Sequence, residues 1–375
     1  MKTPAKHSTA IFTWFIPGLI LLFYALEAYQ KLLGKDSIVT SIKAIVFFAF
    51  MFLCMKLTNK KFWISISMLC IIYTIGQWFT PVSFSYNSML IFFKFLFPLF
   101  VLKSISNQNI NKTIVFNTVE WLFVFNSALI LIGLLLELSF FKTYSGSRFG
   151  FNGLLHASAT SSYIYAIGLM YFILAYKKNA ITNWKFLVII ASCIFIGTKT
   201  VYVFTFFTIV TLLLLNRKTF NKYLIGVCLG LISVGLFIYL FNDSIINSIS
   251  REHGIVTAIL SYRNDLLLNT VGPYVMEFWT WINYLFGGVS NFNLRAQMEI
   301  IDVFFFWGII GGVFYYYLFY KLLITVKLEL TSVFFIVLLS IAFALAGNFF
   351  TYSFVALFLA VLKLTLIKIK ESTLS

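Results

Sequence analysis

The sequence contains little charge, and least of all negative charge. Only 11% of its 375 residues are charged, against about 25% in ordinary globular domains, and Asp and Glu together number 12. Hydrophobic residues make up 61%. A water-soluble enzyme and a disordered chain are therefore excluded, because no soluble core could bury that much apolar surface. The composition predicts one all-α, polytopic membrane domain over residues 1–375.

Residues that build disulfide scaffolds and metal sites are also scarce. The chain has four cysteines and three histidines, and it contains no C-x-x-C motif. The cysteines lie within apolar runs or near their ends, which argues against disulfides and against zinc. We expect no metal and no other cofactor. The net charge of +16 would indicate a nucleic-acid partner in a soluble protein, but in a membrane protein the distribution of charge among the loops is the informative property, and we expect no nucleic acid.

Twelve apolar runs predict about 12 transmembrane helices, since a span needs about 20 mostly apolar residues. They lie at 10–27, 38–56, 62–80, 84–102, 114–137, 156–176, 185–198, 200–215, 223–241, 302–320, 331–348 and 352–367. The seventh and eighth are short and are separated only by Gly197-Thr198-Lys199-Thr200. Short paired segments of this kind often dip toward a site.

An even number of spans places both termini on one side of the membrane. On that side lie 18 of the 28 Lys and Arg residues, against 8 on the other, so the positive-inside rule predicts cytoplasmic termini. Two long loops then face outward, at 139–155 and at 242–301, the second between spans nine and ten. Within the second, 271–288 is aromatic and apolar, and it predicts an interfacial helix; a thirteenth span there is the alternative.

Basic residues collect in three separate outer segments. Arg148 lies in a Gly/Ser-rich loop, Lys199 in the turn between the two short spans, and Arg263 in the large outer loop. His156 at the head of the sixth span and Tyr202 near Lys199 join this set. Each also has a structural explanation, such as snorkelling of a lysine to the interface or a polar role at a helix end.

Two carboxylates enter the tenth span. Glu299 and Asp302 are three residues apart and share one helical face, and Arg295 lies one turn earlier on the same side. Ionisable groups inside a span are costly, at about 2.5–3.5 kcal/mol near its centre, and are candidates for function. The alternative is a carboxylate that complements the helix dipole. Lys94, within the fourth span, carries the same cost.

These features together fit glycosyl transfer from a lipid diphosphate. Apolar walls would hold the lipid, Arg and Lys would neutralise the diphosphate without a metal, and a carboxylate would accept the proton of an attacking sugar hydroxyl.

The chain resembles the Wzy-type O-antigen and capsular polysaccharide polymerases, which are related in architecture to O-antigen ligases. The resemblance covers roughly 110 to 350. It rests on features in the family's order: Arg148-Phe149-Gly150 before a span, Lys199 in a short turn, Arg263 and then Gly287-Gly288 in a large outer loop, and Glu299-x-x-Asp302 followed by Gly308-x-x-Gly311. The ligase branch usually has His-Asn where this chain has Gln297-Met298-Glu299, which favours a polymerase.

The resemblance implies a GT-C-like, metal-independent glycosyltransferase of the bacterial inner membrane. It would transfer a glycan from undecaprenyl diphosphate to the next lipid-linked repeat unit. By position, Glu299 or Asp302 would be the base, and the basic residues would bind diphosphate. A flippase and a chain-length regulator would be partners. A lipid-linked oligosaccharide flippase is the alternative function, but the chain shows no half-repeat, and a secondary transporter is less consistent with charges gathered on one side.

Overall fold

The computed structural model describes residues 7–34, 36–58, 60–81, 84–106, 110–144, 148–215 and 245–374. Regular structure within these ranges is helical, apart from an isolated β-bridge between Lys142 and Phe151. The longer helices are α1 (His7–Leu33), α2 (Asp36–Leu57), α3 (Lys60–Trp78), α4 (Tyr86–Ile105), α5 (Lys112–Leu135), α6 (Ser158–Tyr176), α7 (Trp184–Phe195), α8 (Lys199–Leu215), α15 (Glu299–Leu323), α16 (Leu330–Leu345) and α17 (Ser353–Leu374).

Shorter elements make up most of the loop at 242–301 that the sequence predicts to face outward, here called the large outer loop. They are α10 (Ile245–His253), α11 (Ile255–Leu260), α12 (Arg263–Leu266), a π-turn at Leu267–Val271, α13 (Gly272–Phe278), α14 (Trp281–Phe286) and a 3-10 turn at Phe292–Leu294. Two further 3-10 turns, Ser139–Phe141 and Lys177–Thr182, precede and follow α6.

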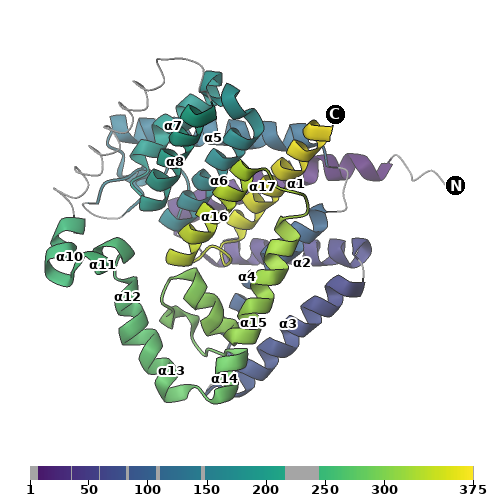
Figure 1. Ribbon diagram of the computed structural model, residues 1–375, viewed down its shortest axis with the longest axis vertical. Coiled ribbons are helices and arrows are strands. Elements are labelled where there is room, and N and C mark those ends of the chain that lie inside the picture. The colour runs from purple at the N-terminus through teal and green to yellow at the C-terminus, as the bar shows by residue number, and fades with distance from the viewer. Residues whose placement is uncertain are drawn as a thin grey trace.

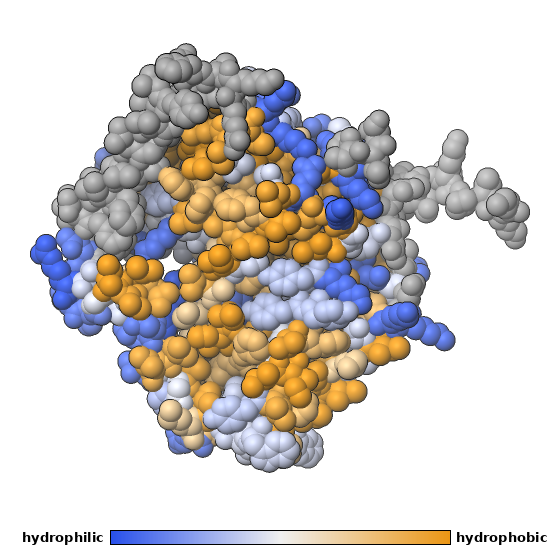
Figure 2. All heavy atoms as spheres, viewed as in Figure 1, coloured by the Kyte–Doolittle hydropathy of each residue, from blue (hydrophilic) through white to orange (hydrophobic). Residues whose placement is uncertain are grey.

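Six helices are long and apolar enough to cross a membrane, namely α1, α2, α4, α5, α6 and α15. Three more, α7, α8 and α16, are apolar but shorter. Hydrophobic side chains form large patches on the face drawn in Figure 2, and large ones such as Leu135 and Leu330 are 79% and 86% exposed. The chain is a multi-pass membrane protein. Eleven of the twelve predicted runs coincide with a helix, and the ninth, 223–241, lies outside the described residues.

Helices α6 and α17 lie at the centre of the bundle and pack against each other (Figure 1). Every residue from Phe354 to Thr365 is buried. Lys363 is within this stretch, and its ammonium donates to the carbonyls of Leu102 (2.8 Å) and Leu322 (2.6 Å). These carbonyls belong to the last turns of α4 and α15, which no longer have intrahelical partners. The buried lysine therefore joins the ends of two helices to α17.

The large outer loop departs from the single interfacial helix expected over 271–288. Helix α13 ends at Phe278, Trp279 is extended, and a new helix, α14, begins at Trp281. The break follows from Thr280 and Asn283, whose side chains cap the first turn of α14 reciprocally. Buried Asn283 also donates to the Gly76 carbonyl (3.1 Å), so α14 docks on α3 and α15 while α10 to α13 follow the edge of the bundle (Figure 1).

Helix α15 is interrupted at Gly308, where φ is 68° and ψ is −174°. This conformation is essentially restricted to glycine. Gly287, at φ 72°, lies at the end of α14. A Cβ added to Gly308 would lie 2.3 Å from the backbone nitrogen of Gly287. The close approach of two backbones seats the large outer loop on the helix that carries the two carboxylates.

Replacing Gly308 should therefore destabilise the protein. A Gly308→Ala variant adds a strained conformation, which costs about 1–3 kcal/mol, and a backbone clash. We expect a loss of several degrees in the thermal midpoint measured by fluorescence-detected size exclusion. Gly18→Ala is the matched control, since nothing lies within 4 Å of its Cβ. Equal midpoints for the two variants would contradict this account of the break.

Candidate functional site

Arg148, Lys199 and Arg263, here called the basic cluster, meet in space although they come from three distant segments. Arg148 lies in the loop between α5 and α6, Lys199 is the first residue of α8, and Arg263 is the first residue of α12. Their charges lie close enough to act on one another. All three side chains are half-buried. Like charges held together in this way favour an anionic ligand.

The loop that carries Arg148 is fastened to the turn between α7 and α8. The Phe151 N–H donates to the Phe195 carbonyl (2.7 Å), and the Thr143 hydroxyl donates to the Ile196 carbonyl (2.8 Å). Gly197, at φ 75°, permits this approach, because a Cβ there would lie 2.3 Å from the Phe149 carbonyl oxygen. The turn and the loop thus fix Arg148 beside Lys199.

Lys31, near the end of α1, holds the other end of the same loop. Its ammonium donates to the carbonyls of Lys142 (3.2 Å), Gly153 (2.7 Å) and Leu155 (3.2 Å), and to the side chain of Asn152. Sequence reasoning did not select Lys31, because its partners lie more than 110 positions away in the sequence.

Tyrosines accompany the basic cluster. The Arg148 guanidinium stacks on the Tyr144 ring, 3.8 Å from its centroid. Burial raises the pKa of the Tyr144 phenol, although the charges of Arg148 and Arg263 oppose the shift. Tyr202 lies near both Tyr144 and Arg148, but its hydroxyl donates to the Ile194 carbonyl (3.1 Å). Stacking thus leaves the guanidinium edge of Arg148 for an anion.

Lys199 already has protein partners. Its ammonium donates to the carbonyls of Ala258 (2.5 Å) and Ile259 (3.0 Å) and to the Ser261 hydroxyl (3.0 Å). These are the last groups of α11, where a cation also complements the helix dipole. Lys199 consequently ties the large outer loop to α8, a contact that its sequence position did not predict.

Arg263 follows two consecutive left-handed residues, Ser261 and Tyr262. Its Nη1 donates to the Leu260 carbonyl (3.1 Å), while its buried Nε has no hydrogen-bond partner among the described residues. Burial lowers the pKa of the guanidinium. An unpaired donor beside two other cations suits an anion that arrives from outside.

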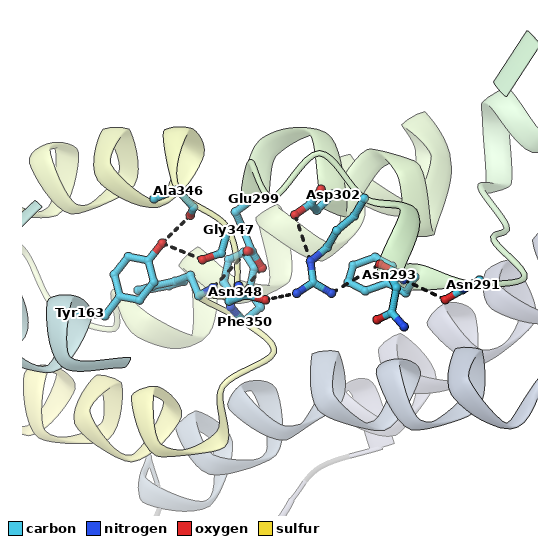
Figure 3. A network of polar contacts seen from close by, with 12 residues as sticks. Tyr163, Asn291, Asn293, Glu299, Asp302, Ala346, Gly347, Asn348 and Phe350 are labelled. Carbon is cyan, nitrogen blue, oxygen red and sulfur yellow. Dashed lines mark hydrogen bonds and ion pairs between the residues drawn. The ribbon is translucent and has the colours of Figure 1, made fainter. Parts of the chain in front are cut away.

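The two carboxylates are both 1% exposed, but they have different partners. Glu299 accepts the backbone N–H groups of Phe349 (3.0 Å) and Phe350 (3.1 Å). Neither oxygen of Asp302 accepts a hydrogen bond of normal geometry from the described residues, and the nearest cation is Arg295, whose Nε lies 3.8 Å away (Figure 3). The sequence left the two equivalent, whereas the structure separates a carboxylate with backbone partners from one without.

The loop between α16 and α17, Ala346–Tyr352, contacts both Glu299 and Arg295 (Figure 3). Buried Tyr163 of α6 donates to the carbonyls of Ala346 and Gly347, the latter at 3.1 Å. The Gly347 N–H donates to the Gln297 carbonyl (2.6 Å), and Arg295 donates to the Asn348 side chain. Tyr163 and Asn348 were missed from the sequence, where neither stands in a pattern.

Arg295 does not share a helix with the carboxylates, contrary to the sequence expectation. Helix α15 begins at Glu299, preceded by left-handed Gln297 and extended Met298. Arg295 is itself extended, and its guanidinium stacks on the Phe292 ring at 4.8 Å. It still reaches Asp302, but from the loop before the helix, because the chain turns at Gln297.

Two cations act on Asp302. One is Arg263 of the basic cluster, and the other is Arg295, whose Nε lies 3.8 Å from the carboxylate. His156 is not part of this arrangement. It is exposed in a different cavity, where its backbone N–H donates to Glu27 (3.3 Å).

Comparison with protein families, with curated proteins and with solved structures finds no match. The geometry is therefore the basis for function. Within the described residues, no three or more His, Cys, Asp or Glu side chains group as metal ligands would.

The unequal partners of Glu299 and Asp302 predict unequal effects on stability. Glu299→Gln removes the oxygen acceptor for one of two buried N–H groups, which costs about 1–3 kcal/mol. Asp302→Asn removes a buried charge that accepts no hydrogen bond of normal geometry and should stay within about 1 kcal/mol of the wild type. Thermal midpoints in the same detergent measure both. A greater loss for Asp302→Asn would reverse the assignment.

Proposed function

We propose that the chain is a polysaccharide polymerase of the Wzy type, a metal-independent glycosyltransferase that uses lipid-diphosphate-linked donors. The observation that carries the proposal is Asp302, a buried carboxylate that accepts no hydrogen bond of normal geometry from the described residues and on which the charge of Arg263 acts. Donor and acceptor would be undecaprenyl-diphosphate-linked oligosaccharides. The proposal includes about 12 spans with both termini in the cytoplasm of a bacterial cell, and the reaction at the outer face of the inner membrane.

In the proposed reaction, a hydroxyl oxygen of the acceptor sugar attacks the anomeric carbon of the donor. The bond between that carbon and the diphosphate oxygen breaks, and the hydroxyl proton passes to Asp302. Arg148 and Arg263 neutralise the charge that develops on the leaving diphosphate. Because Asp302 is only 1% exposed, side chains around it have to move aside when substrate binds.

Glu299, Lys199 and Arg295 have positioning roles in this proposal. Glu299 holds the Ala346–Tyr352 loop, Lys199 holds the end of α11, and Arg295 orients Asp302. Their substitution would act through the shape of the site and through stability. Asp302 and Arg148 are therefore the residues whose loss separates chemistry from folding.

Asp302→Asn should leave the protein folded and inserted but reduce chain elongation by at least about 100-fold, the contribution of a positioned base. The measurement is a reconstituted assay with purified protein and lipid-linked repeat units, scored as a ladder of products. Glu329→Gln is the control, since that carboxylate forms an ion pair with Lys177 at an exposed position. A normal ladder from Asp302→Asn would remove this residue from the mechanism.

Cells with the Asp302→Asn variant should display single repeat units on their outer surface. Repeat units trapped on the cytoplasmic leaflet would instead indicate a flippase.

Arg148→Ala should weaken use of the donor by roughly 10- to 100-fold, the value of one or two charge-assisted hydrogen bonds. The assay is initial rate at limiting lipid-linked donor. Arg251→Ala, an exposed cation of the same outer loop as Arg263, serves as the control. Equal rates for Arg148→Ala and the wild type would contradict the diphosphate role of the basic cluster.

A further inference from the structure

A second charged cavity, here called the α2–α4 pocket, lies apart from the basic cluster. Its volume is about 470 Å³, within the range of small-molecule sites. It is lined by α1, α2, α4, the start of α6 and the loop before α17. The side chains that matter here are Glu27, Lys43, Phe47, Lys94, Phe97 and His156.

Two lysines face this pocket from neighbouring helices. Lys43 of α2 forms an ion pair with Glu27 (3.3 Å), and the other Glu27 oxygen accepts the His156 backbone N–H. Lys94 of α4 forms no ion pair among the described residues, and the charge of Lys43 acts on it. One buried carboxylate thus faces two cations, and the pocket retains a positive charge inside a span, where it is costly.

The pocket changes from polar to aromatic along its depth. Lys43 and Lys94 stand seven and eight residues after the starts of α2 and α4, or roughly 10–12 Å along each helix. His156 lies above them, where α6 begins. Phe47 and Phe97 stand one turn further along the same two helices, and Phe48, on the pocket wall, is 52% exposed toward the outside of the bundle. The order is therefore a polar rim, two cations and an aromatic wall that includes the exposed Phe48 ring.

This order matches an amphiphile better than a free anion. The lysines suit a phosphate group, and the aromatic wall beyond them suits a hydrocarbon chain that continues into the bilayer. A free phosphate would make no use of Phe47, Phe48 and Phe97. An uncharged lipid would leave Lys94 without a partner.

The pocket adjoins the Asp302 site through one shared wall. Thr351 and Tyr352 line the pocket, while Phe349 and Phe350 of the same loop hold Glu299. The charge of Arg295 acts on Lys94, so the guanidinium that orients Asp302 is also close to the pocket. The pocket and the Asp302 site therefore share this loop and the charge of Arg295.

We infer that the α2–α4 pocket binds the phosphate headgroup and first isoprene units of a second polyprenyl lipid. This rests on the proposed function, in which two lipid-linked molecules react and the basic cluster holds the donor diphosphate. The α2–α4 pocket then holds the lipid of the acceptor, beside the loop that Glu299 binds.

The test uses the purified full chain in detergent and farnesyl diphosphate as a short isoprenoid diphosphate. Native mass spectrometry should show two bound equivalents in the wild type. Lys43→Gln and Lys94→Gln should each weaken one equivalent by at least tenfold and leave the other. Lys56→Gln is the control, since this exposed lysine lies at the far end of α2. Farnesol and inorganic pyrophosphate should each bind at least tenfold more weakly than farnesyl diphosphate.

A second variant, Ala44→Phe, fills the pocket without changing its charge and should also remove one equivalent. Size-exclusion profiles check that each variant is folded. Unchanged binding in Ala44→Phe and in both lysine variants would overturn the inference, as would absence of binding in the wild type. Pyrophosphate bound as tightly as farnesyl diphosphate would indicate a free-anion site and overturn the lipid assignment.

The outcomes separate the inference from the proposed function. A single equivalent that only Arg148→Ala removes would overturn the second site and leave the donor site standing. A single equivalent that only the pocket variants remove would support the second site and contradict the donor role of the basic cluster.

Discussion

A charge or a backbone polar group inside a bilayer has no water to solvate it, and this constraint explains four ionisable residues of the bundle. Lys31 satisfies three loop carbonyls, Lys363 satisfies the ends of α4 and α15, Lys199 satisfies the end of α11, and Glu299 satisfies two N–H groups. In each case, one desolvated charge and several unpaired backbone groups compensate each other. Burying each of these charges alone would cost free energy, but each one stabilises the fold through the backbone groups that it binds.

Against that background, Asp302 and Lys94 stand apart. Asp302 has an ion pair at 3.8 Å but no hydrogen bond of normal geometry, and Lys94 has no ion pair within the part of the chain that the structure describes. The N–H groups of Gln297 and Met298 approach Asp302 only outside normal hydrogen-bond geometry, so the constraint that accounts for the others does not account for Asp302 and Lys94. A desolvated charge that does not support the fold needs another reason to persist, and ligand binding or proton transfer is the usual one.

The helices were predictable from the sequence because length and apolarity determine them. The roles of the charges were not, because the partners of each charge lie far away along the chain. The two N–H groups that Glu299 binds are 50 and 51 positions downstream, and Tyr163 reaches a carbonyl 183 positions away. Periodicity gives no help here, since membrane helices are apolar on all sides. The interruption of α15 likewise required Gly287, which approaches Gly308 from the outer loop.

For the basic cluster, residue type alone predicted the charge of the ligand but not the role of each residue. Cations in outer loops indicated an anion site, and the structure brings Arg148, Lys199 and Arg263 together. Residue type did not indicate that the Lys199 ammonium already binds the end of α11. Arg148 and Arg263 are therefore the members of the basic cluster with hydrogen-bond donors left for a ligand.

The Ala346–Tyr352 loop is the element that both sides of the site share. Its middle residues hold Glu299 and Arg295, and its last residues form part of the α2–α4 pocket. Tyr163 fixes its first residues to the buried centre of the bundle. A loop held at three points by buried polar groups has few conformations available. If a lipid headgroup binds in the α2–α4 pocket, the rigid loop keeps it at a constant separation from Glu299 and Arg295, as a reaction between two large membrane-bound substrates requires.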